Sequence, residues 1–381
     1  MLIGLDASRA FSRFIGGPEN YSYYLIRALL KAPSSHRFRL YLRPDSKESP
    51  RYQRFFSDLE MVNCELKVVP WPFLWTQAGL ALECFRNPPD VLFVPAHTIP
   101  LLRPGRLKTI VAIHDLGAEF LPNYHKFPQK YYLNFATEYA VRQATRVITV
   151  SQHTKKDVLG KFKVPSSKCE VIYEGYEEKL FFPRKREEIE KAKERYGIRG
   201  DYLFFVGTIQ PRKNLVRLIE AYSKLIVNCQ LSIEEAPSLV LAGSPGWLYE
   251  DIYGAPQRFG VADRVRFLGR IEDDALPALL SGCRAFVFPS LFEGFGLSLL
   301  EAMACGATTI TSKTTSLPEV GGQAPIYVDP YRTDELTQAL EKVLKMGEDE
   351  RRQLSQRSIS QAAKFTWEKS ASDVLAIIDN I

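Results

Sequence analysis

The stretch PSLFEGFGLSLLEAMACG, residues 289–306, places a glycine-broken turn directly before an apolar helix. The preceding run AFVFPS, from residue 285, has the composition of a buried strand that ends where the turn begins. Gly306 stands where a helix commonly ends. The stretch therefore predicts a strand, a turn and a helix in succession, which is the repeating unit of α/β folds with parallel sheets.

The turn of this unit has the features of an anion-binding site. Gly294 and Gly296 let the backbone approach a ligand closely, because neither carries a side chain. The first backbone N–H groups of a helix have no intrahelical partner and can bind a phosphate. We expect these donors to come from Phe295, Gly296 and Leu297.

Two glutamates flank the predicted anion site. Glu293 lies in the turn, and Glu301 follows Leu297 by one helical turn, so its side chain can lean back toward the site. Both carboxylates could then accept hydrogen bonds from hydroxyl groups on either side of a bound phosphate, as in a nucleotide sugar. The alternative is that both are solvated or capping residues. We favour binding, because an acid within so apolar a helix is hard to place on a water-facing side.

The rest of the chain repeats the alternation of apolar strands with helices. Runs this apolar predict parallel strands that are covered on both faces. The first series is LIGLDAS at residue 2, FRLYLRP at 38, CELKVVP at 64, VLFVPA at 91, TIVAIHD at 109, RVITVS at 146 and CEVIYEG at 169. The second series is DYLFFVGT at 201, SLVLAGS at 238, RVRFLGR at 264, AFVFPS at 285, ATTITS at 307 and PIYVDP at 325. We therefore predict two Rossmann-like, doubly wound parallel-sheet domains, residues 1–175 and 176–364, facing each other across a cleft.

Two cations follow the first strand of the second series. In VGTIQPRKNL, Arg212 and Lys213 come after a proline turn at the start of a helix, where they can neutralise a leaving diphosphate. The alternative, two exposed cations, is disfavoured because the helix dipole opposes positive charge at that end.

The first domain offers two candidate positions at strand ends. FIGGPENYSYY places Gly16 and Gly17 between the first strand and a helix, where backbone amides can meet a phosphate, although turns use such pairs freely. His114 and Asp115 end the strand TIVAIHD, on the side where ligands bind in such sheets. A lone histidine is more commonly a core or surface residue. Asp115 could orient His114 or cap the strand end.

The segment WPFLWTQAGLALECF, starting at Trp71, carries two tryptophans and two phenylalanines with few charges. It could pack against the sheet as core. It could instead form an apolar patch for a lipid-linked acceptor or for peripheral contact with a membrane, where tryptophan is favoured. Basic residues in the same half of the chain would assist docking onto anionic lipid.

The charge of the chain is unevenly distributed. The 381 residues carry a net charge of +6, but residues 1–170 hold 24 Lys and Arg against 14 Asp and Glu, and the remainder holds 26 against 30. A basic half could face nucleic acid, an anionic membrane or phosphorylated substrates, or be an ordinary solvated surface. Because the basic residues are scattered rather than clustered, we expect no nucleic-acid partner.

Cysteine spacing and hydropathy indicate the environment of the protein. The six cysteines form no CxxC pair and no metal spacing, so we expect reduced, mostly buried thiols, without disulfides or structural zinc. No run of about 18 uncharged apolar residues occurs, and MLIGLDASRAF lacks the features of a signal peptide. We therefore expect a cytoplasmic protein.

At this point the sequence resembles a known family. Glu293 and Glu301 in EGFGLSLLEAMACG match the E-x7-E signature of retaining glycosyltransferases with the two-domain GT-B fold, and the chain is similar to the large GT4 family over nearly its whole length. The resemblance implies that the second domain binds a nucleotide-sugar donor and the first an acceptor. It also implies that the last helix, about residues 365–381, crosses back onto the first domain.

The resemblance assigns roles to particular residues. VGTIQPRKNL looks like the family's donor-phosphate segment, with Thr208 where many members carry an arginine, which leaves Lys213 as the main phosphate contact. His114 would lie near the donor sugar and steady charge there. Catalytic roles are therefore expected for His114, Glu293 and Lys213. The expected donor-binding residues are Gly16, Gly17, Thr208, Arg212, Lys213, Glu293, Gly294, Phe295, Gly296, Leu297 and Glu301.

The segments GTIQPRKNL and IGGPENYSYYLIRAL look most like those of bacterial mannosyltransferases of surface polysaccharide assembly. GDP-mannose is therefore the leading donor, with UDP-linked sugars or another GDP-sugar behind it, and the acceptor would be a saccharide or lipid-linked saccharide. We expect neither a metal nor another cofactor, because amides and cations are available to stabilise the leaving diphosphate. Front-face attack is the favoured route to retention of configuration at the anomeric carbon.

Four other functions remain to be weighed. A glycoside hydrolase needs two carboxylates across one bond, which would leave the glycine turn and the Arg-Lys pair without purpose. An epimerase acting on a nucleotide sugar shares the fold, and an assay for sugar transfer separates the two. A non-catalytic nucleotide-sugar-binding subunit would bind donor without turnover. A dehydrogenase is the least favoured, since no strand-linked GxGxxG occurs.

Overall fold

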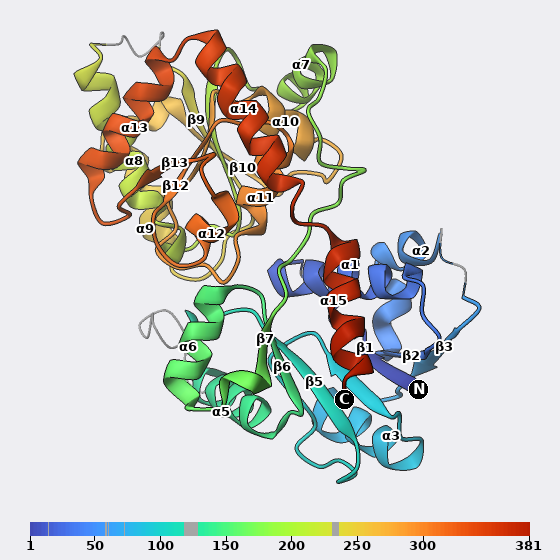
Figure 1. Cartoon of the computed structure of the whole chain (residues 1–381). Helices are drawn as coiled ribbons and strands as arrows, with labels where there is room; N and C mark the ends of the chain where they lie inside the picture. The colour runs from blue at the N-terminus through green and yellow to red at the C-terminus, as the bar shows by residue number, and fades with distance from the viewer. Residues whose placement is uncertain (14, 58, 60, 72, 118–128, 231–235) are drawn as a thin grey trace. The chain divides into compact units, whose positions relative to one another are not determined.

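The computed structural model describes residues 1–13, 15–57, 59, 61–71, 73–117, 129–230 and 236–381 (Figure 1). Phe14 and Pro72, which belong to two of the segments quoted above, lie outside the described residues. The chain forms two compact units. Unit 1 comprises Met1–Gly175 together with Thr366–Ile381, and unit 2 comprises Tyr176–Phe365.

Unit 1 is built on a seven-stranded parallel sheet with the strand order β3-β2-β1-β4-β5-β6-β7. The strands are β1 (Leu2–Asp6), β2 (Arg37–Leu42), β3 (Cys64–Val68), β4 (Val91–Val94), β5 (Lys108–Ile113), β6 (Arg146–Thr149) and β7 (Cys169–Val171). The order changes direction between β1 and β4, and in such sheets ligands bind beyond the carboxyl ends of the strands at that switch point.

The helices of unit 1 include one from the far end of the chain. They are α1 (Gly17–Lys31), η1 (Pro44–Glu48), α2 (Arg51–Phe56), η2 (Trp75–Leu80), α3 (Ala81–Arg86), α5 (Gln129–Gln143), α6 (Gln152–Phe162), η4 (Ser166–Lys168) and α15 (Trp367–Asp379). The apolar face of α15 packs on α1, where the rings of Tyr24 and Trp367 stack with centroids 5.9 Å apart. Residues 366–381 therefore complete the core of the unit that contains the first residues.

Unit 2 is built on a six-stranded parallel sheet with the order β10-β9-β8-β11-β12-β13, and its switch point lies between β8 and β11. The strands are β8 (Tyr202–Val206), β9 (Ser238–Ala242), β10 (Val265–Gly269), β11 (Ala285–Phe288), β12 (Thr309–Ser312) and β13 (Ile326–Val328). The helices are α7 (Arg186–Arg195), η5 (Pro211–Lys213), α8 (Leu215–Asn228), α9 (Glu250–Arg258), η6 (Ala262–Arg264), α10 (Leu276–Gly282), α11 (Leu297–Ala304), α12 (Leu317–Gly321), α13 (Thr333–Lys345) and α14 (Glu348–Ala362).

Burial explains why the strands were recognisable from their composition. Every residue of β4, β9 and β11 is buried, as expected for parallel strands covered on both faces. The edge strands are less buried, most of all β3, in which Leu66 and Val68 are exposed. The prediction of two parallel α/β sheets is confirmed.

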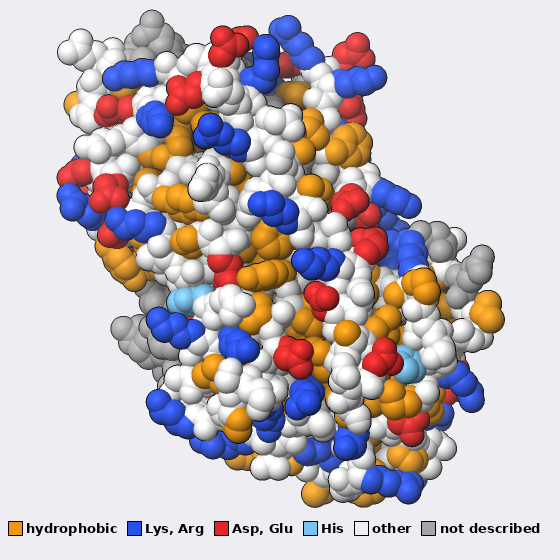
Figure 2. Space-filling view, in the orientation of Figure 1, with side chains coloured by type: hydrophobic (Ala, Val, Ile, Leu, Met, Phe, Trp, Pro, Cys, Tyr) orange, Lys and Arg blue, Asp and Glu red, His pale blue; other side chains and the backbone are white. Residues whose placement is uncertain are grey.

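Further observations bear on the environment of the protein. All six cysteines are free, and four of them are buried. In the part of the chain that the structure describes, no helix is long and apolar enough to cross a bilayer. On the face shown in Figure 2, the lysine and arginine side chains of unit 1 are spread over the surface and do not gather in one patch.

Candidate functional site

The switch point of unit 2 brings two of the predicted segments together. Strands β8 and β11 are direct neighbours, so the turns that follow them lie side by side. The backbone N–H of Leu291, after β11, donates to the carbonyl of Arg212, after β8, at 2.8 Å. This hydrogen bond fixes the cationic segment against the glycine turn.

The central feature of this switch point is a buried ion pair between Lys213 and Glu293. The Nζ of Lys213 lies 2.5 Å from Oε1 of Glu293, and each side chain is only 8% exposed. Phe288 closes one side, with its ring centroid 4.6 Å from Nζ. Arg212 lies at the edge, 4.0 Å from the second carboxylate oxygen. Both cations predicted to bind phosphate therefore also neutralise Glu293.

The ion pair sets the charge state of Glu293. Burial acts to raise the pKa of this carboxyl, but the charges of Lys213 and Arg212 outweigh burial, so the pKa lies below its ordinary value. Asn214 orients the lysine turn: it adopts a left-handed conformation with φ of 60°, and its amide donates to the carbonyls of Pro289 and Pro330 at 3.2 and 2.7 Å. Glu293 is thus held as an anion within the fold.

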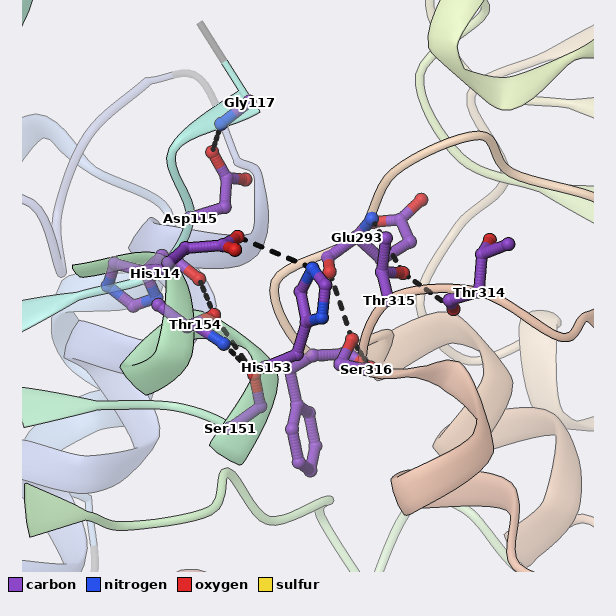
Figure 3. Close-up of polar contacts among 12 residues, drawn as sticks. His114, Asp115, Gly117, Ser151, His153, Thr154, Glu293, Thr314, Thr315 and Ser316 are labelled. Atoms are coloured by element: carbon purple, nitrogen blue, oxygen red, sulfur yellow. Dashed lines mark hydrogen bonds and ion pairs between the residues drawn. The ribbon is translucent and has the colours of Figure 1, made fainter. Parts of the chain in front are cut away.

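Thr315 and Ser316, which lie between β12 and α12, hold the glycine turn after β11 in place (Figure 3). The hydroxyl of Ser316 donates to the carbonyls of Glu293 and Phe295 at 3.0 and 2.9 Å, and the Glu293 N–H donates to the hydroxyl of Thr315 at 3.3 Å. Gly296 has φ of +107°, and a Cβ there would lie 2.8 Å from Leu317, so both backbone and packing require glycine.

Helix α11 begins at Leu297 directly after this turn. No side chain caps it in the described structure, and its first backbone N–H groups follow the two glycines, as an anion site requires. Phe295 is buried, with its ring packed on Phe365 at a centroid distance of 5.7 Å. Glu301 is half-buried on α11, one turn beyond Leu297, and Gly294 lies in the turn itself. Thr208 is exposed on the turn after β8.

In unit 1 the glycine pair lies where β1 leads into α1. Gly16 is the residue before the helix, and a Cβ there would come within 3.0 Å of the Glu19 carboxylate. A Cβ on Gly17 would meet none of the described residues within 4 Å, and no positive φ requires glycine there. The packing of unit 1 therefore leaves space at Gly17 that a ligand could use.

His114 follows β5 and is buried. Its Nδ1 lies 3.2 Å from Oε1 of Glu174 and its Nε2 lies 2.8 Å from the carbonyl oxygen of Pro95. Thr154 at the start of α6 donates its hydroxyl to the His114 carbonyl at 3.1 Å, as Figure 3 shows. The carboxylate of Asp115 accepts a hydrogen bond from the Gly117 N–H at 2.9 Å. This contact corresponds to the alternative in which Asp115 caps the end of the strand.

Three polar residues of unit 1 were missed by the sequence analysis. Glu174 is buried against His114, three residues after β7. His97 follows β4 with a positive φ of 41°, its ring centroid is 5.4 Å from that of His114, and burial together with the His114 charge lowers its pKa to about 3. Asp6 ends β1, and burial raises the pKa of its carboxyl. All three stand at or just after strand ends, so a scan of every strand end for polar residues would have found them.

Comparison with known families matches both units. Residues 15–180 match the family described as Glycosyltransferase Family 4, and residues 186–361 match the family described as Glycosyl transferases group 1. The chain is 30% identical over 275 residues to the O-antigen chain mannosyltransferase B of Escherichia coli, an alignment that covers 71% of this chain and 70% of that protein. It is 32% identical over 287 residues to the serotype-specific mannosyltransferase WbdA of Escherichia coli, covering 73% of this chain but only 33% of that longer protein.

Solved structures share the architecture. HepE of Anabaena in complex with UDP and glucose superposes with a TM-score of 0.75 at 18% identity over 100% of both chains. WaaG, a glycosyltransferase involved in lipopolysaccharide biosynthesis, superposes with a TM-score of 0.73 at 17% identity over 99% of both chains. These two structures bear on the fold alone. The two family matches and the relatives of about 30% identity establish that the chain is a glycosyltransferase of family 4, and the shared architecture gives it the GT-B fold.

Proposed function

We propose that the protein is a retaining mannosyltransferase that moves mannose from GDP-mannose onto a saccharide or lipid-linked saccharide acceptor during the synthesis of a cell-surface polysaccharide. The choice of mannose is supported by relatives that are O-antigen mannosyltransferases. The observation that carries the donor site is the buried Lys213–Glu293 pair at the switch point of unit 2.

Unit 2 would bind the donor through the segments that meet at its switch point. The diphosphate would lie at the amino terminus of α11, where backbone N–H groups and the helix dipole favour an anion. Arg212, a quarter exposed, is positioned to add a charged contact. Glu301, one turn into α11, would accept hydrogen bonds from the ribose hydroxyls.

The Lys213–Glu293 pair would serve the sugar and the leaving group together. A lysine ammonium has three N–H donors, so Lys213 can bind Glu293 and a phosphate oxygen at the same time. Because Glu293 is ionised, both its oxygens accept hydrogen bonds, and the one not bound by Lys213 can take a sugar hydroxyl. Each residue would thus hold the other in position for the donor.

Transfer would proceed on one face of the sugar. The bond from the anomeric carbon to the diphosphate oxygen breaks, and its electron pair leaves with the oxygen. The acceptor hydroxyl forms the new bond on the same face and passes its proton to that departing oxygen. Arg212 and Lys213 would neutralise the charge that develops on the diphosphate. Since the protein supplies this positive charge, we propose that transfer needs no metal and no other cofactor.

The donor is tested by melting the purified protein with GDP, UDP, ADP and their sugars, with and without magnesium. A ligand at a hundred times its dissociation constant stabilises the folded state by about 2.7 kcal/mol. We expect selective stabilisation by GDP and GDP-mannose, lost in Glu301→Gln and retained in the control Glu187→Gln, whose side chain is exposed on α7. Stabilisation by UDP alone would replace GDP-mannose with a UDP-sugar, and no response to any nucleotide would contradict the donor site.

Turnover separates an enzyme from a non-catalytic binding subunit. GDP release from GDP-mannose should require a saccharide acceptor, and the product should keep the donor's anomeric configuration when examined by proton NMR. Inversion of that configuration would contradict front-face transfer. Binding of GDP-mannose without release of GDP in any acceptor mixture would favour the non-catalytic subunit.

Unit 1 would bind the acceptor and contact the membrane that carries it. Trp71, Phe73 and Leu74 are exposed, Phe73 by 80%, whereas Trp75 is buried in the core beneath them. The Leu101 N–H donates to the Gln77 side chain at 2.8 Å, which brings the exposed Leu101 and Leu102 beside the same helix. We call these five residues, Trp71, Phe73, Leu74, Leu101 and Leu102, the apolar surface. Its aromatic and leucine side chains suit the interface of a bilayer, so the enzyme would work at the cytoplasmic face of the membrane.

Membrane contact is tested by sedimentation with vesicles of phosphatidylglycerol and, separately, of phosphatidylcholine. The protein should sediment with the anionic vesicles, because unit 1 is basic, and the double variant Phe73→Ser/Leu74→Ser should not. Val227→Ser is the control, since Val227 is similarly exposed but belongs to unit 2. Equal sedimentation of the double variant and the unchanged protein would contradict a membrane role of this surface.

A further inference from the structure

The surroundings of His114 restrict where its protons can be. Nδ1 faces a carboxylate oxygen of Glu174 at 3.2 Å, and Nε2 faces the carbonyl oxygen of Pro95 at 2.8 Å. A carbonyl oxygen and an ionised carboxylate can only accept hydrogen bonds. A neutral imidazole has one N–H and one lone pair, so one of its nitrogens would face an oxygen without a proton between them. Only the imidazolium, which donates from both nitrogens, satisfies both partners while Glu174 is ionised.

From this arrangement we infer that Glu174 is a positioning residue that keeps His114 as an imidazolium, protonated on both ring nitrogens at neutral pH. The inference rests on the proposed function for its consequence, but the charge state can be measured without any transfer reaction. His114 and Glu174 are both buried, so the carboxylate also supplies the charge that a buried cation needs.

The other groups around the ring agree with a cation. Tyr21 on α1 meets it edge to face, with centroids 4.6 Å apart, and carries no charge because burial and then the Glu174 charge raise the pKa of its hydroxyl well above the ordinary value. His97, after β4, stays neutral because of burial and of the His114 charge. Asp115 adds a negative charge next to His114 in the chain, and Arg9 is the other cation that acts on His97.

The chemical role of His114 follows from its two bound protons. Because neither nitrogen has a lone pair available, His114 cannot remove the proton of the acceptor hydroxyl. It can instead hold a fixed positive charge at the end of β5, where it would stabilise negative charge on the donor. Glu174 would act on the reaction only through this ring.

The direct test is NMR of the protein with nitrogen-15 in its histidine rings. The chain has five histidines, and the His114 signals are assigned by their loss in His114→Gln. At about pH 7.5 both ring nitrogens of His114 should show imidazolium shifts. In Glu174→Gln the amide can donate to Nδ1, so His114 should become neutral with its proton on Nε2, and the doubly protonated fraction should fall about tenfold or more.

The matched control is Glu170→Gln, which removes a half-exposed carboxylate of β7 that lies 3.8 Å from Arg146. It should leave the His114 signals unchanged. In the transfer assay Glu174→Gln should lower kcat at neutral pH and recover part of it as the pH falls, because acid restores the imidazolium. Its melting response to GDP should not change, since the nucleotide would bind unit 2.

Several outcomes would overturn the inference. A neutral His114 in the unchanged protein at neutral pH would do so, and this measurement decides even if Glu174→Gln fails to fold. An imidazolium that persists in Glu174→Gln would show that Glu174 does not set the charge. A proton held on Glu174 beside a neutral ring would likewise contradict it. If no sugar is transferred at all, the proposed function fails while the NMR result still tests Glu174.

Discussion

Replacing Lys213 by methionine should destabilise unit 2 strongly at neutral pH and much less in acid. Methionine keeps the length and the apolar stem of lysine but removes its charge. Glu293 would then be left as a buried carboxylate whose remaining cation is Arg212, at 4.0 Å and at the edge of the site. The change therefore isolates the ion pair from the packing around it.

The distance and burial of the pair set the magnitude. At 2.5 Å and an effective dielectric constant of about 20, the attraction between Lys213 and Glu293 is about 7 kcal/mol. The cost of removing both charges from water offsets part of this attraction. Breaking a buried pair by deleting one partner commonly costs about 3–5 kcal/mol of unfolding free energy. For a unit of this size, that corresponds to a fall in Tm of about 6–20 °C.

The pH dependence follows from the pKa of Glu293, which the fold lowers. A carboxyl whose pKa is lower in the folded state than in the unfolded state stabilises the protein at pH values above its unfolded pKa, about 4.3. This stabilisation is lost as the pH falls through its folded pKa. In Lys213→Met the main opposing charge is gone, so burial should raise this pKa instead. Glu293 in the variant can then lose its buried charge by binding a proton. The variant's loss of unfolding free energy, relative to the unchanged chain, should therefore become smaller as the pH falls toward about 5.

The assay is thermal unfolding of four proteins across pH: the unchanged chain, Lys213→Met, Glu293→Gln and the double variant. If the two single losses of unfolding free energy were additive, their sum would give the stability of the double variant. We expect the double variant to be more stable than this sum by more than about 1 kcal/mol. Lys224→Met is the control, because Lys224 makes two ion pairs of 3.2 Å while 45% exposed, so the loss of its charge should change Tm much less than Lys213→Met does. Additive losses, or a Lys213→Met deficit that does not depend on pH, would refute the reasoning.

Three further variants test the turns around the site, and a fourth, Gly254→Ala, is a control within a helix. Gly17→Ala should leave Tm unchanged, because a Cβ there meets no described atom within 4 Å, but it should lower the rate of sugar transfer if substrate uses that space. Gly243→Ala should lower the unfolding free energy by more than about 4 kcal/mol, because φ is +138° there and the new Cβ would lie 1.8 Å from the Gly207 carbonyl. Gly254→Ala, within α9, should instead raise the unfolding free energy by about 0.5–1 kcal/mol. Thermal unfolding measures both. Ser316→Ala removes the hydroxyl that donates to the carbonyls of Glu293 and Phe295, so it should lower the unfolding free energy by about 1–3 kcal/mol and weaken stabilisation by GDP.

The sequence was sufficient for the fold because its strands are almost uniformly apolar. A run such as AFVFPS can only be covered on both faces, and the helices between such runs leave a parallel sheet as the solution. The sequence was insufficient for the segment after Trp71, where the same composition suits core and surface. The structure divides it, with Trp75 buried and Phe73 exposed.

The sequence predicted the candidate residues one by one, but it did not predict which of them are paired. Lys213 and Glu293 are 80 residues apart and meet because β8 and β11 are neighbours at the switch point, which residue spacing does not reveal. His114 and Glu174 are 60 residues apart, and Glu174 was overlooked because it follows a strand of only three residues. Local patterns therefore predicted the candidate turns, whereas strand order decides which side chains touch.

The return of α15 to unit 1 has a consequence for biosynthesis. Residues 176–365 leave the ribosome between the two parts of unit 1, and at about 5–20 residues per second they take about ten to forty seconds to make. Throughout that time the face of α1 that will meet Trp367 has no partner from α15, and uncovered apolar surface on a nascent chain favours aggregation. The unit that is begun first is thus the last to be completed, and a stop codon after unit 2 would damage the domain at the opposite end of the gene.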